Sequence, residues 1–340
     1  MLDYRHLIRM TDDIGILQFS KYSTPDINSG YTLDDNARAL IVALSIKNDC
    51  SLAVKYAKWL KNAEQADGSW SNLLVHGAYT SRFDSEDSIG RALLACSVGS
   101  TSPWKEVVEI CDNLFNRHII KVNSFTSPRA IAYSLIALCK RYEHQKTSPN
   151  ENLSKELAYK LMNLYAAKSS KNWAWFENYL TYCNGILPQA LFCYYAVSGD
   201  KKALKIAHSS LNFLNDILFR KGYLNIIGNQ GWYHRGKSIP LFDQQPVDAA
   251  SIIFACMEAY QTIGETEYLQ LATIAYQWFR GKNIHNLSLY DETTGGCFDA
   301  LTESGVNLNQ GAESLLALLL ADTLMLRFIK QEDISVNKTS

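Results

Sequence analysis

Two adjacent carboxylates, Asp34 and Asp35, stand directly before a run of small apolar residues, and an arginine, Arg38, follows them by about one helical turn. The run, residues 37–46, is almost entirely apolar. A helix that is apolar on every side is usually buried, so polar groups at its start need partners, a ligand, or both. A pair of carboxyl groups can act as the general acid and general base that hydrolyse a glycosidic bond.

Further carboxylates stand beside later apolar runs. Glu177 lies in a stretch, residues 173–179, with several large aromatic residues. Such surroundings would raise the pKa of its carboxyl group, as a general acid needs. Asp248 and Glu313 fall in the first turn of later apolar runs, where a buried acid needs a partner or a function. The expected catalytic residues are Glu177 as the acid, Asp35 or Glu313 as the base, and Asp34 and Asp248 as further candidates.

The helix starts and the loops before them also carry arginines, amides and aromatic rings. These groups suit a sugar, because hydroxyls need paired polar partners and the apolar face of a sugar ring stacks on aromatic rings. The expected substrate-binding residues are Arg38, Glu86, Asp87, Arg91, Arg129, Trp173, Trp175, Tyr179, Asn184, Trp232, His234, Asp243, Gln244, Gln245, Asn309 and Gln310. No two histidines have the spacing of metal ligands, so we expect no metal and no cofactor.

Each acidic cluster also has a purely structural interpretation. Thr32 and Asp35 fit a capping box, and Ser85 stands before Glu86 in a similar way. Acidic residues in a first turn are stabilised by the helix dipole in any case. Glu177 could point to water beside a plug of aromatic side chains. Capping and catalysis both stay open for these residues.

The pattern that positions these residues is an alternation of helices. Apolar runs begin near residues 34, 86, 127, 184, 245 and 309, and amphipathic segments follow at 52–65, 104–118, 154–167, 202–219, 267–280 and 322–329. Buried helices inside an amphipathic shell predict an all-α fold, an (α/α)6 barrel, rather than an open solenoid with shorter and more uniform repeats. Parallel inner helices would gather their N-terminal ends at one rim. We expect one domain over residues 1–330, a frayed polar tail over 331–340, an opening helix within 4–20, and short hairpins within 222–235 and 295–306.

Composition excludes several classes of function. The net charge is −1 and no Lys/Arg-rich run occurs, which argues against nucleic acid as a partner. No apolar stretch is long enough to span a bilayer, and no signal peptide is evident at the N-terminus. The eight cysteines form no CxxC pair, and several lie within apolar runs, as reduced thiols do. A cytoplasmic protein is expected.

Four segments together resemble a family of bacterial proteins of about this length. They are residues 30–40, 173–191, 242–249 and 294–314. Members are often labelled "glycosyltransferase" because they occur beside glycosyltransferases and mannoside phosphorylases, although nothing here resembles the doubly wound nucleotide-sugar fold. The resemblance implies a mannose-type oligosaccharide or polysaccharide as substrate and a glycosyltransferase as a possible partner. The family pattern carries acids where this chain has Asn178 and Cys183.

Three functions follow as hypotheses. The first is a glycoside hydrolase-like enzyme that inverts configuration, with its acid and base about 6.5–9.5 Å apart. The second is a non-catalytic, glycan-binding partner of a glycosyltransferase, which the two missing acids favour. The third is a lyase or sugar epimerase, with Tyr79, Tyr182 or His234 as the base. A single QW-like stretch, residues 59–70, resembles terpene cyclases, but that family would need more copies.

Overall fold

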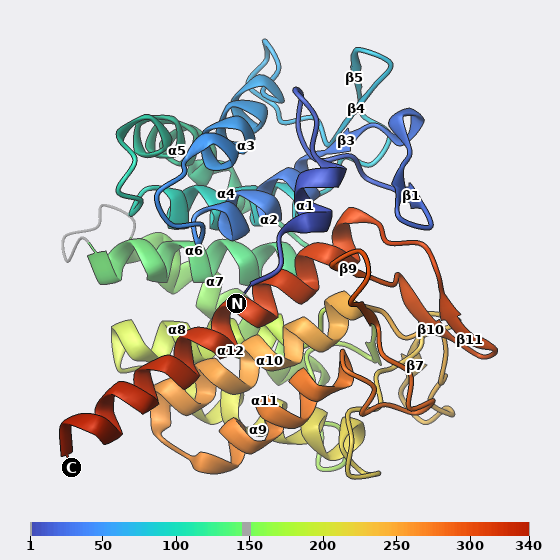
Figure 1. Ribbon diagram of the computed structural model, residues 1–340. Coiled ribbons are helices and arrows are strands. Elements are labelled where there is room, and N and C mark those ends of the chain that lie inside the picture. The colour runs from blue at the N-terminus through green and yellow to red at the C-terminus, as the bar shows by residue number, and fades with distance from the viewer. Residues whose placement is uncertain (1, 145–150, 340) are drawn as a thin grey trace.

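A ring of parallel inner helices forms the centre of the molecule in the computed structural model, which describes residues 2–144 and 151–339 (Figure 1). Each inner helix packs against the next, and α12 packs against α2 to close the ring. The inner helices are α2 (Leu33–Ala43), α4 (Glu86–Gly99), α6 (Pro128–His144), α8 (Ile186–Ser198), α10 (Pro246–Ile263) and α12 (Ala312–Thr339). The predicted (α/α)6 barrel is confirmed.

Amphipathic helices cover the outside of this ring. They are α1 (Arg5–Met10), α3 (Ser51–Asn62), α5 (Lys105–His118), α7 (Glu151–Lys168), α9 (Lys201–Leu218) and α11 (Thr266–Trp278), with the 3-10 turns η1 (Ile27–Ser29) and η2 (Ile119–Ser124). Inner helices bury residues on nearly every side, whereas outer helices such as α5 and α9 bury one stripe. This difference is the one that the apolar and amphipathic runs predict.

Side-chain caps fix where two of the inner helices begin. The Thr32 hydroxyl oxygen accepts a hydrogen bond from the Asp35 amide at 3.1 Å, and that of Ser85 accepts one from Ser88 at 3.1 Å. The capping role predicted for Thr32 and Ser85 is therefore confirmed. At α8, Pro188 lies within the first turn, where its missing N–H has no partner to lose.

Short antiparallel strands line one end of the ring, where the inner helices begin (Figure 1). The pairs are β1 (Ser20–Lys21) with β2 (Thr24–Pro25), β6 (Tyr179–Leu180) with β7 (Tyr233–His234), β8 (Tyr290–Asp291) with β9 (Gly296–Cys297), and β10 (Ala300–Thr302) with β11 (Gly305–Asn307); β3 (Tyr31–Thr32), β4 (Leu73–Val75) and β5 (Ala78–Thr80) form a small sheet. The β3–β4 and β6–β7 pairings tie together loops that are far apart in the sequence, whereas the other pairings are local hairpins.

Some local predictions differ from the structure. The opening helix ends at Met10, because the Asp12 carboxylate accepts hydrogen bonds from Ile14 and Gly15 and turns the chain. A hairpin over residues 295–306 is present as β10 and β11, but residues 222–235 form none, since β7 pairs with β6 instead. Residues 322–329, expected as a separate amphipathic helix, continue α12, and so do residues 331–339, expected as a frayed tail. No glycine or proline interrupts the chain between residues 312 and 339.

The cysteines of the structure are all free thiols, and most are buried in the core. None of the described helices is both long and apolar enough to cross a bilayer.

Candidate functional site

The first turns of the inner helices deliver carboxylates to one end of the barrel. Asp34 and Asp35 lie in the first turn of α2, Glu86 and Asp87 in that of α4, and Asp248 and Glu313 in those of α10 and α12. The N-terminal end of a helix carries partial positive charge, which stabilises an anion there. The fold thereby concentrates negative charge at this rim.

Two adjoining cavities open at this rim and meet at Ser85, Gln245 and Glu313. We call the first, of about 520 Å³, the Trp232 lobe; it is lined by Ser85, Glu86, Asp87, Arg91, Ser127, Tyr182, Cys183, Trp232, Gln245, Val247 and Glu313. The second, of about 790 Å³, is the Phe83 lobe, lined by Gln18, Phe19, Thr32, Asp34, Asp35, Arg38, Asn72, Phe83, Asp84, Ser85, Asn229, Asp243, Gln245, Asp299, Ala300, Asn307, Gly311, Glu313 and Ser314. Each lobe has the size of a complete small-molecule site.

One guanidinium group bridges two carboxylates beside this junction. Arg38 Nη1 donates to Asp35 Oδ1 at 3.1 Å, and Arg38 Nη2 donates to Glu313 Oε2 at 3.0 Å. The Asp35 and Arg38 side chains are almost wholly buried, whereas the Glu313 side chain is 45% exposed and faces both lobes. The Arg38 guanidinium group thus holds the buried Asp35 carboxyl group and the accessible Glu313 carboxylate beside each other.

The pKa values of the two adjacent acids of α2 are shifted in opposite directions. Burial raises the pKa of Asp35 to about 6, and the nearby Glu313 carboxylate adds to this rise. Burial also acts against ionisation of Asp34, but the Arg91 and Arg38 guanidinium groups outweigh it and leave the pKa of Asp34 lowered. Neighbouring carboxyl groups whose pKa values are pushed apart are a common arrangement in acid–base sites.

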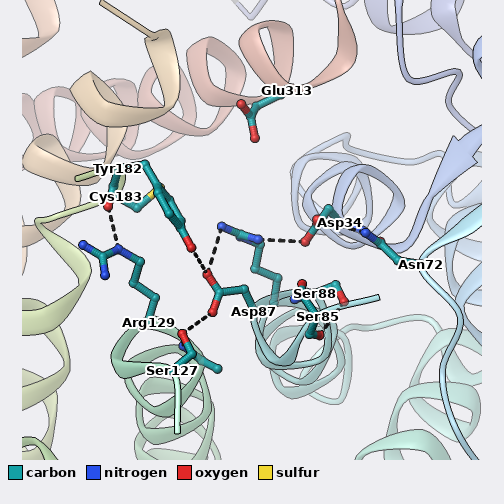
Figure 2. Close-up of polar contacts among 12 residues, drawn as sticks. Asp34, Asn72, Ser85, Asp87, Ser88, Ser127, Arg129, Tyr182, Cys183 and Glu313 are labelled. Carbon is teal, nitrogen blue, oxygen red and sulfur yellow. Dashed lines mark hydrogen bonds and ion pairs between the residues drawn. The ribbon is translucent and has the colours of Figure 1, made fainter. Parts of the chain in front are cut away.

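Asp87 is the centre of a hydrogen-bond network among residues that line the Trp232 lobe (Figure 2). The Ser127 hydroxyl donates to Asp87 Oδ1 at 2.5 Å, and the Tyr182 hydroxyl donates to Asp87 Oδ2 at 2.7 Å. Arg91, which lies 4.0 Å from Asp87, donates to Asp34 Oδ1 at 2.9 Å. The network fixes the phenol ring of Tyr182 at the lobe and links α4, α6 and α2.

Glu177 lies in a different environment from the one predicted. Its carboxylate accepts a hydrogen bond from Arg129 Nη1 at 2.9 Å, and the Arg129 side chain is buried. Arg129 also donates to the Tyr182 carbonyl oxygen at 2.7 Å and to Asn184 at 3.2 Å. Glu177 lines neither lobe. Its contacts suit a partner that holds Arg129, and through it the turn that carries Tyr182.

Asp248 holds the same turn from the other side. Its carboxylate accepts a hydrogen bond from the Cys183 amide, and burial raises its pKa to about 7. Cys183 has a positive φ of 46°, which is uncommon for a residue with a side chain. Such backbone strain persists only where surrounding contacts impose it. Asp248 therefore supports the conformation that places Tyr182 and Cys183 against the Trp232 lobe.

The structure brings part of the predicted site together and leaves part elsewhere. The predicted residues that line a lobe are Asp34, Asp35, Arg38, Glu86, Asp87, Arg91, Trp232, Asp243, Gln245 and Glu313. Those that line neither are Arg129, Trp173, Trp175, Glu177, Tyr179, Asn184, His234, Gln244, Asp248, Asn309 and Gln310.

Several of the residues outside the lobes have structural contacts instead. Trp175 is fully buried in the core, and Trp173 packs against Phe213. The Gln244 side chain donates to the Leu241 carbonyl oxygen, and that of Gln310 donates to Asp291. Other parts of the protein cover these four side chains in this structure. They are therefore not placed for the direct contact with a sugar that the sequence suggested.

Other lining residues lie in loops and were not predicted. Asn72 donates to the Phe83 carbonyl oxygen at 2.8 Å and accepts from the Asp34 amide at 3.2 Å, which ties this loop to the start of α2. Asp299 accepts from the Gly311 amide at 2.8 Å, and burial raises its pKa. These residues follow no periodic pattern, so the sequence alone carries little signal for them.

Among the residues that the structure describes, no cluster of His, Cys, Asp and Glu is arranged to hold a metal ion. The described lining of both lobes contains carboxylates but no histidine. The lining of the two lobes offers carboxyl groups, arginines, the Tyr182 phenol and the Cys183 thiol.

No protein-family model and no curated protein sequence matches the chain. Solved structures do match it over nearly its full length. A sugar epimerase from a ruminal bacterium superposes with a TM-score of 0.72 at 14% identity, covering 95% of each chain. The cellobiose 2-epimerase of Bacillus thermoamylovorans gives 0.73 at 9% identity, covering 94% of this chain and 95% of that one. The family 76 α-1,6-mannanase of a Salegentibacter species gives 0.62 at 13% identity, covering 94% and 95%. At these identities the likeness establishes the shared barrel fold.

Proposed function

We propose that this protein is a carbohydrate-active enzyme, a glycoside hydrolase-like protein that inverts configuration on a mannose-type or related oligosaccharide. The observation that carries this proposal is the Asp35–Arg38–Glu313 bridge beside the junction of the lobes. The bridge holds two carboxyl groups at one guanidinium, and the inverting mechanism that we propose needs them roughly 6.5–9.5 Å apart. The mannose-type substrate is suggested by the α-mannanase among its structural neighbours and by the motif resemblance.

Asp35 is the better general acid and Glu313 the better general base. With its pKa raised to about 6, Asp35 can carry a proton near neutral pH and donate it to the glycosidic oxygen as the bond to the anomeric carbon breaks. Glu313, exposed to both lobes, would take a proton from a water molecule as that water attacks the anomeric carbon. Arg38 orients both groups. This assignment replaces Glu177, which is paired with Arg129 away from the lobes.

A turnover screen tests this proposal. Manno- and gluco-oligosaccharides would be incubated with the wild type, Asp35→Asn, Glu313→Gln and the exposed control Asp13→Asn, and new reducing ends would be measured. We expect release from one series by the wild type and the control, and a loss of roughly 10²–10⁴-fold in each active-site variant. Unchanged rates in both variants would rule out this acid–base pair.

Epimerisation is the second candidate, favoured by the epimerases among the structural neighbours. It would need a base at the sugar C2 position, and Tyr182, held by Asp87 at the Trp232 lobe, is the available phenol. The product would be an isomer of the substrate with the same number of sugar units, and in D₂O it would carry solvent deuterium at C2.

A third candidate is a glycan-binding module that partners a glycosyltransferase. Cys183 favours it, since this thiol lines the Trp232 lobe at a position where the resembled family carries an acid. This candidate predicts sugar binding without turnover of any kind.

A further inference from the structure

The rim cavity is larger than one sugar ring needs, and its two lobes have only part of their lining in common. Ser85, Gln245 and Glu313 belong to both lobes. The proposed base therefore lies between two spaces, each of which is as large as a whole small-molecule site. A ligand confined to one lobe would leave the other filled only by solvent.

Each lobe also carries its own aromatic surface. In the first, Trp232 lies beside Tyr182, with ring centroids 6.1 Å apart. In the second, Phe19 and Phe83 are exposed residues, with relative exposures of 53% and 47%. Exposed aromatic rings on opposite sides of a polar junction are surfaces on which separate sugar rings can stack.

Backbone contacts hold these aromatic residues in place relative to the proposed catalytic groups. The Phe83 carbonyl oxygen accepts from Asn72, whose side chain also binds the start of α2. The loop of Trp232 is tied by the β6–β7 pairing to the strand that precedes Tyr182. Both surfaces are thus anchored to the elements that carry the carboxylates, as preorganised binding sites require.

We propose that the substrate is an oligosaccharide or polysaccharide chain that occupies both lobes, with sugar rings on either side of the bond at Glu313. The protein then cuts within chains rather than removing single terminal sugars. This inference rests on the proposed hydrolase function and adds to it the size of the substrate and the position of the cut.

Binding to Glu313→Gln, which should hold substrate without cutting it, tests this directly. Calorimetric titrations would use manno-oligosaccharides from the monosaccharide to the hexasaccharide, with a cello-oligosaccharide series in parallel. We expect affinity to rise with chain length beyond the disaccharide. Trp232→Ala and Phe83→Ala, each added to Glu313→Gln, should weaken binding of the longest ligand by roughly 2–10-fold. The two losses should combine in the double variant, and Tyr159→Ala, an exposed aromatic of outer helix α7, should have no effect.

The outcomes separate this inference from the function on which it rests. Affinity that stops rising at one ring, or long ligands that are indifferent to both aromatic substitutions, would overturn the two-lobe substrate while turnover by the wild type left the hydrolase proposal intact. Absence of binding for every sugar in both series would overturn both. As a second readout, early products of several lengths from the hexasaccharide support internal cutting, whereas release of monosaccharide alone contradicts it.

Discussion

Asp34 and Asp35 are neighbours in sequence, yet their pKa values move in opposite directions because their partners differ. Asp34 faces Arg91 and Arg38, which lower its pKa, whereas Asp35 is buried and its pKa is raised to about 6. The pair therefore supplies one fixed negative charge and one carboxyl group able to carry a proton near neutrality. A general acid acts only while protonated.

The pH dependence of activity should follow Asp35. We expect kcat/KM to fall as the pH rises through about 6, because the raised pKa of Asp35 is where this acid loses its proton. The Thr32 hydroxyl donates to Asp35 Oδ2 at 2.7 Å and lowers the pKa of Asp35. Thr32→Val should therefore move the fall in kcat/KM to higher pH. Initial rates from pH 4 to 9 measure both effects. If kcat/KM falls at the same pH in Thr32→Val as in the wild type, the fall reports the titration of another group.

Glu177 gives the clearest contrast between catalysis and support. Because it holds Arg129 outside both lobes, Glu177→Gln should keep kcat within roughly tenfold of the wild type while the free energy of unfolding falls by roughly 1–3 kcal/mol. Urea unfolding beside steady-state kinetics separates the two quantities. A loss of roughly 10²-fold or more in kcat with unchanged stability would return Glu177 to the role of general acid.

The sequence pointed to several carboxylates that line the lobes, but it ranked Glu177, which lines neither lobe, as the expected acid. Asp34, Asp35 and Glu313 stand at helix starts, which local patterns reveal. What decides their roles comes from far along the chain: Glu313 reaches Arg38 across 275 residues, and Arg129 reaches Glu177 across 48. Without those partners, aromatic neighbours in sequence made Glu177 look like an acid in an apolar pocket.

At the scale of elements, the inner helices approach one another closely where side chains are small. Gly185, just before α8, is the tightest such point: a Cβ there would lie 2.2 Å from the Ser251 carbonyl oxygen of α10. The Gly185 backbone itself has an ordinary helical conformation, with φ of −58°. A glycine is needed at this position because the two backbones leave no room for a side chain. The conformational freedom of glycine is not the reason.

Gly185→Ala should therefore separate α8 from α10 and lower the free energy of unfolding by roughly 1–3 kcal/mol, as overpacked cores do. Thermal and urea unfolding measure the loss. Ala196→Ser, at an exposed position of the same helix, is the matched control and should change stability by less than about 0.5 kcal/mol. Equal stability of Gly185→Ala and the wild type would mean that the two helices can move apart without cost.

Element types were predictable, whereas some ends and connections were not. Apolar and amphipathic runs identify inner and outer helices because burial on all sides and on one side leave different patterns. Caps such as Thr32 and Ser85 mark starts in the same way. The early end of α1 depends on a local turn at Asp12, whereas the pairing of β7 with β6 joins loops that are distant in sequence. Neither feature leaves a periodic signal.

At the scale of the whole molecule, the ring turns dispersed residues into one surface. Each parallel inner helix directs its N-terminal end to the same rim, where the short strands lie (Figure 1). Residues of these helix starts and of the loops beside them line the two lobes. The barrel is shared with sugar epimerases and mannanases, so the fold alone does not choose between their reactions. Our proposal of hydrolysis rests instead on the carboxylates that line the two lobes.

The measurement that separates these reactions most directly is a proton NMR time course of a manno-oligosaccharide incubated with the enzyme in D₂O. Hydrolysis by Asp35 and Glu313 predicts shorter sugars with inverted configuration at the new reducing end, unexchanged hydrogen at C2, and no reaction with Asp35→Asn or Glu313→Gln. A product of unchanged length that carries deuterium at C2, or shortening that persists in both variants, would contradict it.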